Sequence, residues 1–208
     1  MSRTFLAEMH FDGGRFLGWQ RQASGRTVQA EVEGVLHANP WFSILQQAVR
    51  RPDGSAGTHY TIHHARPAVG IVARRDDRFL LIRQHRFIID QLVWAIPSGN
   101  IEAGESAADA ATRELREEAG LEAASLRPLI HYFPSYGCSD QRFELFLAEG
   151  VAPSGGGVDR AEVIRARWFS RSEIETMIRE NGIVDGLSLV PLLYVLLLDR
   201  TITGEALR

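Results

Sequence analysis

The sequence predicts an α/β fold in which a mixed sheet lies between helices. Apolar segments typical of strands and helices follow one another in the order strands, helix, strands, helix, which indicates such a layered arrangement. A chain of 208 residues with 45% hydrophobic and 24% charged residues can bury the core of one domain and carry a further segment. We expect three blocks, at residues 1–38, 39–66 and 67–208.

The first block, residues 1–38, has a strand-like start, a glycine-containing turn and an amphipathic helix. The apolar positions of this helix are Val28, Val32 and Val35 or Leu36. Asn39-Pro40 ends the helix, because the residue before a proline is biased away from helical conformation.

The second block, residues 39–66, contains two strand candidates at 42–51 and 59–65. They flank Pro52-Asp53-Gly54, a sequence typical of a turn. We therefore expect a β-hairpin with a rather long loop.

The third block, residues 67–208, begins with strand candidates joined by a polar turn at 74–78. A helix is predicted at 107–119, since Ser106 suits the N-cap and Gly120 suits the left-handed residue after a helix. The strands are expected near 68–73, 79–84, 129–133, 143–148 and 165–169, and two further helices near 172–180 and 187–199. A flexible segment is expected at 154–157.

Four carboxylates are concentrated around the helix predicted at 107–119. Glu105 precedes it, and Glu114, Glu117 and Glu118 share one of its faces, where their mutual repulsion is costly unless a cation is bound. Oxygen ligands suit Mg²⁺ or Mn²⁺, which proteins usually hold with a few carboxylates and substrate phosphates. The sequence therefore predicts a divalent metal and a phosphate substrate. The alternative is an ordinary surface helix rich in glutamate and arginine.

Composition and charge exclude several other classes of protein. The net charge of −3 argues against a dedicated nucleic-acid surface, which usually carries a strong basic excess. The single cysteine, Cys138, rules out an internal disulfide and fits a reducing cytoplasm. Residues 1–10 lack a signal-peptide core, and the apolar run 192–198 is far below the roughly 20 residues that span a bilayer. We expect a cytoplasmic protein without a membrane partner.

Residues 99–121, GNIEAGESAADAATRELREEAGL, occupy all nine fixed places of the pattern Gly-x5-Glu-x7-Arg-Glu-apolar-x-Glu-Glu-x-Gly-apolar. The chain therefore resembles the Nudix hydrolases. The segments NPWFSI, RQHR, WAIPSG and YFPSYGCSDQRFELFLAEG extend the resemblance, over residues 39–206, to the branch of ADP-ribose pyrophosphatases and other nucleoside diphosphate sugar hydrolases. The resemblance implies an α/β/α sandwich, Mg²⁺ or Mn²⁺ as cofactor, a small nucleotide substrate, and a homodimer in which the N-terminal hairpin packs across the partner.

For the metal, the resemblance implies Glu114 and Glu118 as ligands, with Glu117 as a further ligand or a base. It adds the backbone carbonyl of Ser98 as a ligand. Arg113 is expected to orient the glutamates.

Glu105 is expected to be a structural partner of Arg113 rather than a metal ligand. The general base is expected to be Glu162, in the loop before the strand predicted at 165–169. Asp159 and Glu117 are the alternatives for that base.

Four residues are expected to contact the substrate. Arg83 and Arg86 carry guanidinium groups, which match phosphate oxygens in a fork. Gly99 and Tyr136 complete this set. Tyr136 stands where ADP-ribose pyrophosphatases tend to have proline, and Ala95 stands where they often have an acidic residue; a tyrosine near this place is more usual in the dinucleoside polyphosphate branch.

Residues 5–36 resemble the start of TruA-type tRNA pseudouridine synthases through FLAEMHFDGGRFLGWQRQ and RTVQAEVEGVL. The catalytic aspartate motif of those enzymes, Gly-Arg-Thr-Asp-x-Gly-Val-His, does not occur in the sequence, so we expect no pseudouridine synthesis. We expect a role in packing or dimerisation, with weak RNA contact through Arg15, Arg21 and Arg26 as the alternative. Two other function classes remain open, a non-catalytic ADP-ribose sensor and an RNA-binding protein.

Overall fold

The computed structural model describes residues 34–156 and 163–198 of the chain. The chain divides into two compact units, Met1–Ala65 and Arg66–Arg208. The strand and most of the helix predicted within residues 1–38 lie outside the described residues, as does the TruA-like segment up to residue 33.

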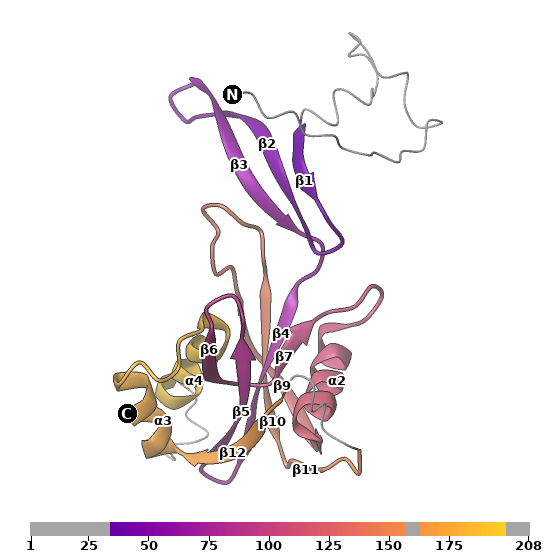
Figure 1. Cartoon of the computed structure of the whole chain (residues 1–208), viewed down its shortest axis with the longest axis vertical. Helices are drawn as coiled ribbons and strands as arrows, with labels where there is room; N and C mark the ends of the chain where they lie inside the picture. Colours follow the sequence, from indigo (N-terminus) through magenta and orange to yellow (C-terminus); the bar gives the residue numbers. More distant parts are fainter. Residues whose placement is uncertain (1–33, 157–162, 199–208) are drawn as a thin grey trace, which may run out of the picture. The chain divides into compact units, whose positions relative to one another are not determined.

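The described part of the first unit is an antiparallel sheet of three strands in the order β1-β2-β3 (Figure 1). β2 (Phe42–Arg50) and β3 (Ala56–His64) pair along their whole length and confirm the predicted hairpin. Asp53 fixes the turn between them, because its carboxylate accepts hydrogen bonds from the Ser55 backbone N–H at 2.9 Å and from the Ser55 hydroxyl at 2.7 Å.

The prediction of a helix that extends to Ala38 is wrong at its end. Residues Val35–Ala38 form strand β1, which pairs with β2. The free edge of β2 offers unpaired backbone groups that this segment satisfies, and such non-local pairing overrides local helix propensity. The Asn39 side chain closes the turn by accepting hydrogen bonds at 2.9 Å from the backbone N–H groups of Trp41 and Phe42.

The described part of the second unit contains a seven-stranded mixed sheet. The strand order is β12-β5-β4-β10-β9, with β6 paired to β5 and β7 to β4; β4 and β10 run parallel, and the other pairs are antiparallel. The strands are β4 (Ala68–Arg75), β5 (Arg78–Arg86), β6 (Gln91–Ala95), β7 (Ser98–Asn100), β9 (Ser125–Tyr132), β10 (Phe143–Glu149) and β12 (Arg165–Ser170). A separate short pair joins β8 (Leu121–Glu122) to β11 (Ala152–Pro153).

Helices cover both faces of this sheet (Figure 1). One core joins α2 (Ala107–Ala119) to the sheet through residues such as Leu115 and Ile71. The other joins α3 (Arg171–Arg179) and α4 (Gly186–Leu198) to the opposite face through residues such as Leu192 and Val72. Successive residues of β4 thus face opposite cores, which explains its almost uninterrupted burial. The predicted α/β/α sandwich is confirmed.

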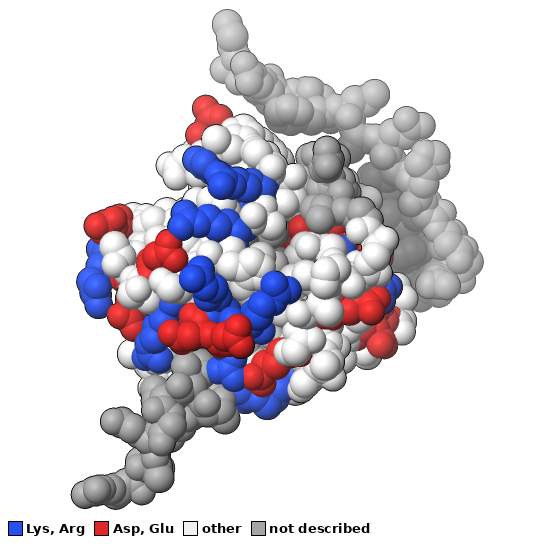
Figure 2. Space-filling model, turned by 90° about the horizontal axis from the view of Figure 1, so that it is seen from below, with Lys and Arg blue, Asp and Glu red and all other residues white. Residues whose placement is uncertain are grey.

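The surface of the protein carries charges of both signs. Figure 2 shows a face on which Arg side chains are interspersed with Asp and Glu side chains. Ion pairs in the second unit include Arg74 with Glu149 and Arg167 with Glu173. Within residues 34–156 and 163–198, no helix combines the length and the hydropathy that a bilayer span requires.

Candidate active site

Helix α2 carries two buried carboxylates. Its N-cap Ser106 accepts a hydrogen bond from the Asp109 backbone N–H at 3.1 Å, and it ends at Gly120, whose φ of 65° is left-handed. The spacing of four residues places Glu114 and Glu118 on one line of the helix, where they are 9% and 4% exposed. Because burial of an ionised carboxylate is costly, each requires compensating donors or a cation.

Arg113 links three glutamates, two on this helix and one just before it. It binds Glu105 in a bidentate manner, with two nitrogen-to-oxygen distances of 3.0 Å. It also donates to Glu114 at 2.7 Å, to Glu117 at 3.2 Å and to the backbone carbonyl of Asn100 at 2.9 Å. The hydrogen bonds from Arg113 hold the pKa of the Glu105 carboxyl below its ordinary value. In return, these carboxylates, and Glu105 first, raise the pKa of the guanidinium.

Both oxygens of Glu118 are held from outside the helix. The side-chain amide of Gln84 on β5 donates to Oε1 at 2.7 Å. The backbone N–H of Ser98 on β7 donates to Oε2 at 2.6 Å. The carboxylate of Glu118 therefore sits between α2 and the two strands in one fixed orientation.

Strand β7 passes so close to α2 that Glu114 fills the space beside Gly99. A Cβ atom built at position 99 would lie 2.0 Å from Glu114 Oε1 and 2.2 Å from its Cδ. Residue 99 must consequently be glycine if Glu114 is to keep its place. The backbone of 98–99 therefore lies against both buried carboxylates.

A model of the NUDIX domain family matches residues 64–185, more than half of the chain. The chain belongs to the NUDIX domain family.

The similarity of this NUDIX protein to known proteins extends beyond that segment. It is 29% identical over 164 residues to CMP-5'-(N-acetyl-N-hydroxy-3-aminopropyl)phosphonate hydrolase of Streptomyces rubellomurinus, covering 79% of this chain and 80% of that protein. It is 29% identical over 173 residues to the ADP-ribose pyrophosphatase of Mycobacterium tuberculosis, and the match covers 81% of this chain and 82% of that protein. A solved structure, the crystal structure of ADP compounds hydrolase, superposes with a TM-score of 0.72 at 20% identity. The match covers 82% of this chain and 91% of that chain.

These matches confirm the Nudix assignment made from residues 99–121 and the prediction that the protein is a hydrolase. The TruA resemblance of residues 5–36 gains no support from them, because the family match begins at residue 64.

The residues expected to bind metal lie together in the NUDIX fold. Glu114, Glu118 and the Ser98 backbone are joined by the contacts above, while Glu117 is on the same helix with its side chain 54% exposed. Among the described residues, no three His, Cys, Asp or Glu side chains converge closely enough to form a ready-made metal cluster. Arg113, Gln84 and the Ser98 N–H hold these carboxylates instead, and such donors offset the repulsion between ionised groups.

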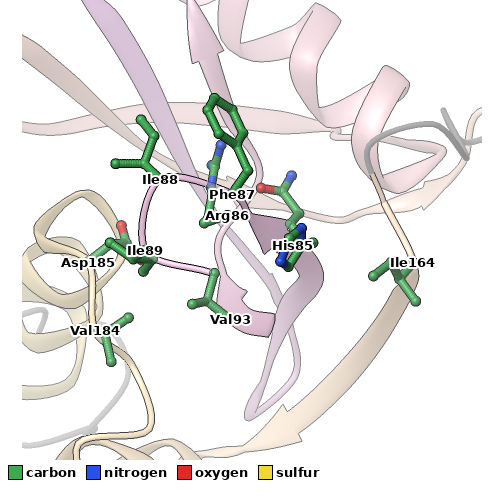
Figure 3. A pocket seen from close by; sticks show the side chains of 10 residues that line it. His85, Arg86, Phe87, Ile88, Ile89, Val93, Ile164, Val184 and Asp185 are labelled. Carbon is green, nitrogen blue, oxygen red and sulfur yellow. The ribbon is translucent and has the colours of Figure 1, made fainter. Parts of the chain in front are cut away.

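The two arginines expected to contact substrate lie on β5. Arg83 pairs with Trp94 across the strands, its guanidinium is 5.7 Å from the centre of the Trp94 ring, and its buried Nε has no hydrogen-bond partner in the described part of the chain. Arg86 lines a cavity of about 790 Å³ at the end of β5 (Figure 3). The cavity is lined by Gln84, His85, Arg86, Phe87, Ile88, Ile89, Val93, Ile164, Val184 and Asp185.

One expected site residue, Tyr136, stands apart from this group. Tyr136 is 89% exposed in the turn between β9 and β10 and is not among the residues that line the cavity. Asp159 and Glu162, the candidate bases of the later loop, lie outside the described residues. Sequence reasoning missed Gln84, whose one available signal was a polar residue within an apolar strand.

Proposed function

We propose that the protein is a divalent-metal-dependent hydrolase that cleaves the diphosphate of a nucleoside diphosphate linked to another moiety. ADP-ribose and related nucleotide sugars are the preferred substrates, giving a nucleoside monophosphate and a sugar phosphate. The observation that carries this proposal is the pair of buried carboxylates, Glu114 and Glu118, packed against the backbone of 98–99. The names of the two relatives support it, since both describe hydrolysis of nucleotide derivatives.

The donor set suits Mg²⁺ or Mn²⁺, because it consists of carboxylate and carbonyl oxygens only. Glu114 and Glu118 would hold the cation, with Glu117 and the Ser98 carbonyl as further ligands. When bound, such a cation neutralises charge on the phosphates and activates a water molecule. Arg113 holds Glu114 and Glu117 in place through its charged hydrogen bonds.

For the general base we propose Glu162, with Asp159 and Glu117 as alternatives. The chain re-enters the described part at Val163, and the next residue, Ile164, donates its backbone N–H to the Arg83 carbonyl at 2.9 Å. Residue 162 is therefore two positions from a residue bonded to β5, whose Gln84 binds Glu118. A base must approach the attacking water at roughly 3 Å.

For substrate contact we propose Arg83 and Arg86 on the phosphates or ribose, together with Gly99 and Tyr136. Unpaired guanidinium N–H groups, such as the buried Nε of Arg83, suit phosphate oxygens.

We also propose that residues 39–66 mediate a homodimer and that residues 1–38 serve packing or dimerisation. The described part of the first unit supports this, because Trp41 and Tyr60 are 69% and 55% exposed, and large exposed aromatic side chains are typical of interfaces. A cytoplasmic location fits the lone cysteine, Cys138.

Substitution of Gly99 by alanine should lower turnover about a hundredfold while the fold persists, since misplacing a catalytic group by about 1 Å costs that much. The new methyl group would meet the flexible end of Glu114, which moves more readily than backbone and would leave its place beside β7. Turnover and the midpoint of thermal unfolding check this result. Gly34→Ala, which introduces no contact within 4 Å, is the matched control. Equal turnover in Gly99→Ala and wild type would show that Glu114 need not occupy this place.

A substrate panel tests the proposed function. The purified protein is incubated at neutral and alkaline pH, with Mg²⁺ or Mn²⁺, with ADP-ribose, sugar nucleotides, NADH, dinucleoside polyphosphates and oxidised nucleotides. We expect the highest kcat/KM for ADP-ribose or a sugar nucleotide. Tight binding of ADP-ribose without hydrolysis would identify a sensor instead, and preference for dinucleoside polyphosphates would move the substrate assignment to that class.

A further inference from the structure

Gln84 is a polar side chain in the buried part of β5, with only 4% of its surface exposed. Leu81 and Ile82, three and two positions earlier on the strand, are fully buried apolar residues, and the Gln84 backbone pairs with Val93 of β6. An amide in such surroundings costs free energy unless its polar atoms are hydrogen-bonded. The contacts of Gln84 therefore indicate what this residue contributes.

The amide of Gln84 is directed at one carboxylate. Its Nε2 donates to Glu118 Oε1 at 2.7 Å, while the Ser98 backbone N–H donates to Glu118 Oε2 at 2.6 Å. A donor on each oxygen fixes the plane of the carboxylate. Only the NH₂ group of Gln84 can face an ionised Glu118, because its carbonyl would place two acceptors together.

The other end of the amide is not paired. Gln84 Oε1 is buried and accepts no hydrogen bond from the residues that the structure describes. A glutamine selected only to join β5 to α2 would be expected to satisfy both ends of its amide. The arrangement instead favours the single contact with Glu118 over full satisfaction of Gln84.

We propose that Gln84 is a positioning residue, whose amide orients the Glu118 carboxylate for cation binding. This inference rests on the proposed function, in which Glu118 is a metal ligand. Residues that hydrogen-bond metal ligands typically change metal affinity or activity by about 10–100-fold when they are replaced. Gln84 acts through Glu118 and touches neither substrate nor reacting atoms in this scheme.

Two substitutions of similar size remove the donor without adding a charge, Gln84→Met and Gln84→Leu. The measurement is the Kd for Mn²⁺ in the absence of nucleotide, by electron paramagnetic resonance, with thermal unfolding of the metal-free protein recorded in parallel. Both variants should bind Mn²⁺ about 10–100-fold more weakly than wild type. Gln91→Met, at an exposed glutamine of the neighbouring strand β6, should bind Mn²⁺ like wild type.

A double variant separates positioning from general loss of structure. If Gln84 acts through Glu118, adding Gln84→Met to Glu118→Gln should cause no further loss of Mn²⁺ affinity. An unchanged Kd in folded Gln84→Met and Gln84→Leu would overturn the inference, as would losses that add fully in the double variant. Failure of the wild-type protein to bind Mn²⁺ would overturn the proposed function and this inference together, whereas binding by wild type and variants alike would overturn this inference alone.

Discussion

Replacement of Glu118 by glutamine should lower kcat about a thousandfold, because a bound cation supplies several kcal/mol of transition-state stabilisation and each 1.36 kcal/mol is tenfold in rate. The change removes the charge of a proposed metal ligand but keeps its shape. A glutamine carbonyl can still accept the hydrogen bond from the Ser98 N–H, and Gln84 can turn its amide to accept one. The fold should therefore persist, with little change in thermal unfolding.

Glu122→Gln is the matched control for this substitution, because Glu122 is a half-exposed glutamate whose carboxylate lies 3.4 Å from Arg116. It should leave kcat unchanged. Glu118 is 4% exposed, so glutamine tests its charge more cleanly than a smaller residue would. Near-wild-type kcat in Glu118→Gln at saturating Mg²⁺ would remove Glu118 from the proposed metal site.

Substitution of Arg113 by lysine should lower the free energy of unfolding by about 2 kcal/mol and lower turnover as well, since charged hydrogen bonds contribute about 1.5–3 kcal/mol each and this side chain is 29% exposed. A lysine ammonium cannot reproduce the bidentate contact with Glu105 while it also reaches Glu114 and the Asn100 carbonyl. Urea unfolding at neutral pH measures the loss.

Arg116→Lys is the control for Arg113→Lys, because Arg116 is 51% exposed. The loss of unfolding free energy in Arg113→Lys should also depend on pH. Arg113 holds the pKa of Glu105 below its ordinary value, so the stabilisation is present above that ordinary value and disappears as the pH falls through the lowered pKa. Equal stability of Arg113→Lys and wild type at neutral pH would show that the contacts of Arg113 contribute little to the fold.

Local sequence signals predicted the elements whose ends are set by local chemistry. Helix α2 begins after Ser106 and ends before Gly120 as expected, because a side-chain cap and a left-handed glycine act within a few residues. Strand β7 was not among the predicted strands, since Pro97 and Gly99 are typical of loops. It forms because β4 supplies backbone partners that lie about 30 residues earlier in the chain. Residues 68–70 of β4 pair with residues 98–100.

In the candidate site, too, contacts between residues close in sequence were predicted and contacts between distant residues were not. Arg113 and the helix glutamates are close in sequence, so helical periodicity brought them together, and Glu105 lies just before the same helix. Gln84 was missed because its contact with Glu118 joins residues 34 positions apart. Alternation along β5 did not single it out, because helices cover both faces of the sheet and the strand reads as almost uniformly buried.

The most direct test of the central claim is the fate of ADP-ribose with the wild-type protein and Mg²⁺, followed by ³¹P nuclear magnetic resonance. Two diphosphate resonances should be replaced by equal amounts of AMP and ribose 5-phosphate. The reaction should stop with EDTA, resume with excess Mg²⁺ and be almost absent in Glu118→Gln. Cleavage that continues unchanged in EDTA and in Glu118→Gln would contradict a metal site built on the buried carboxylates of α2.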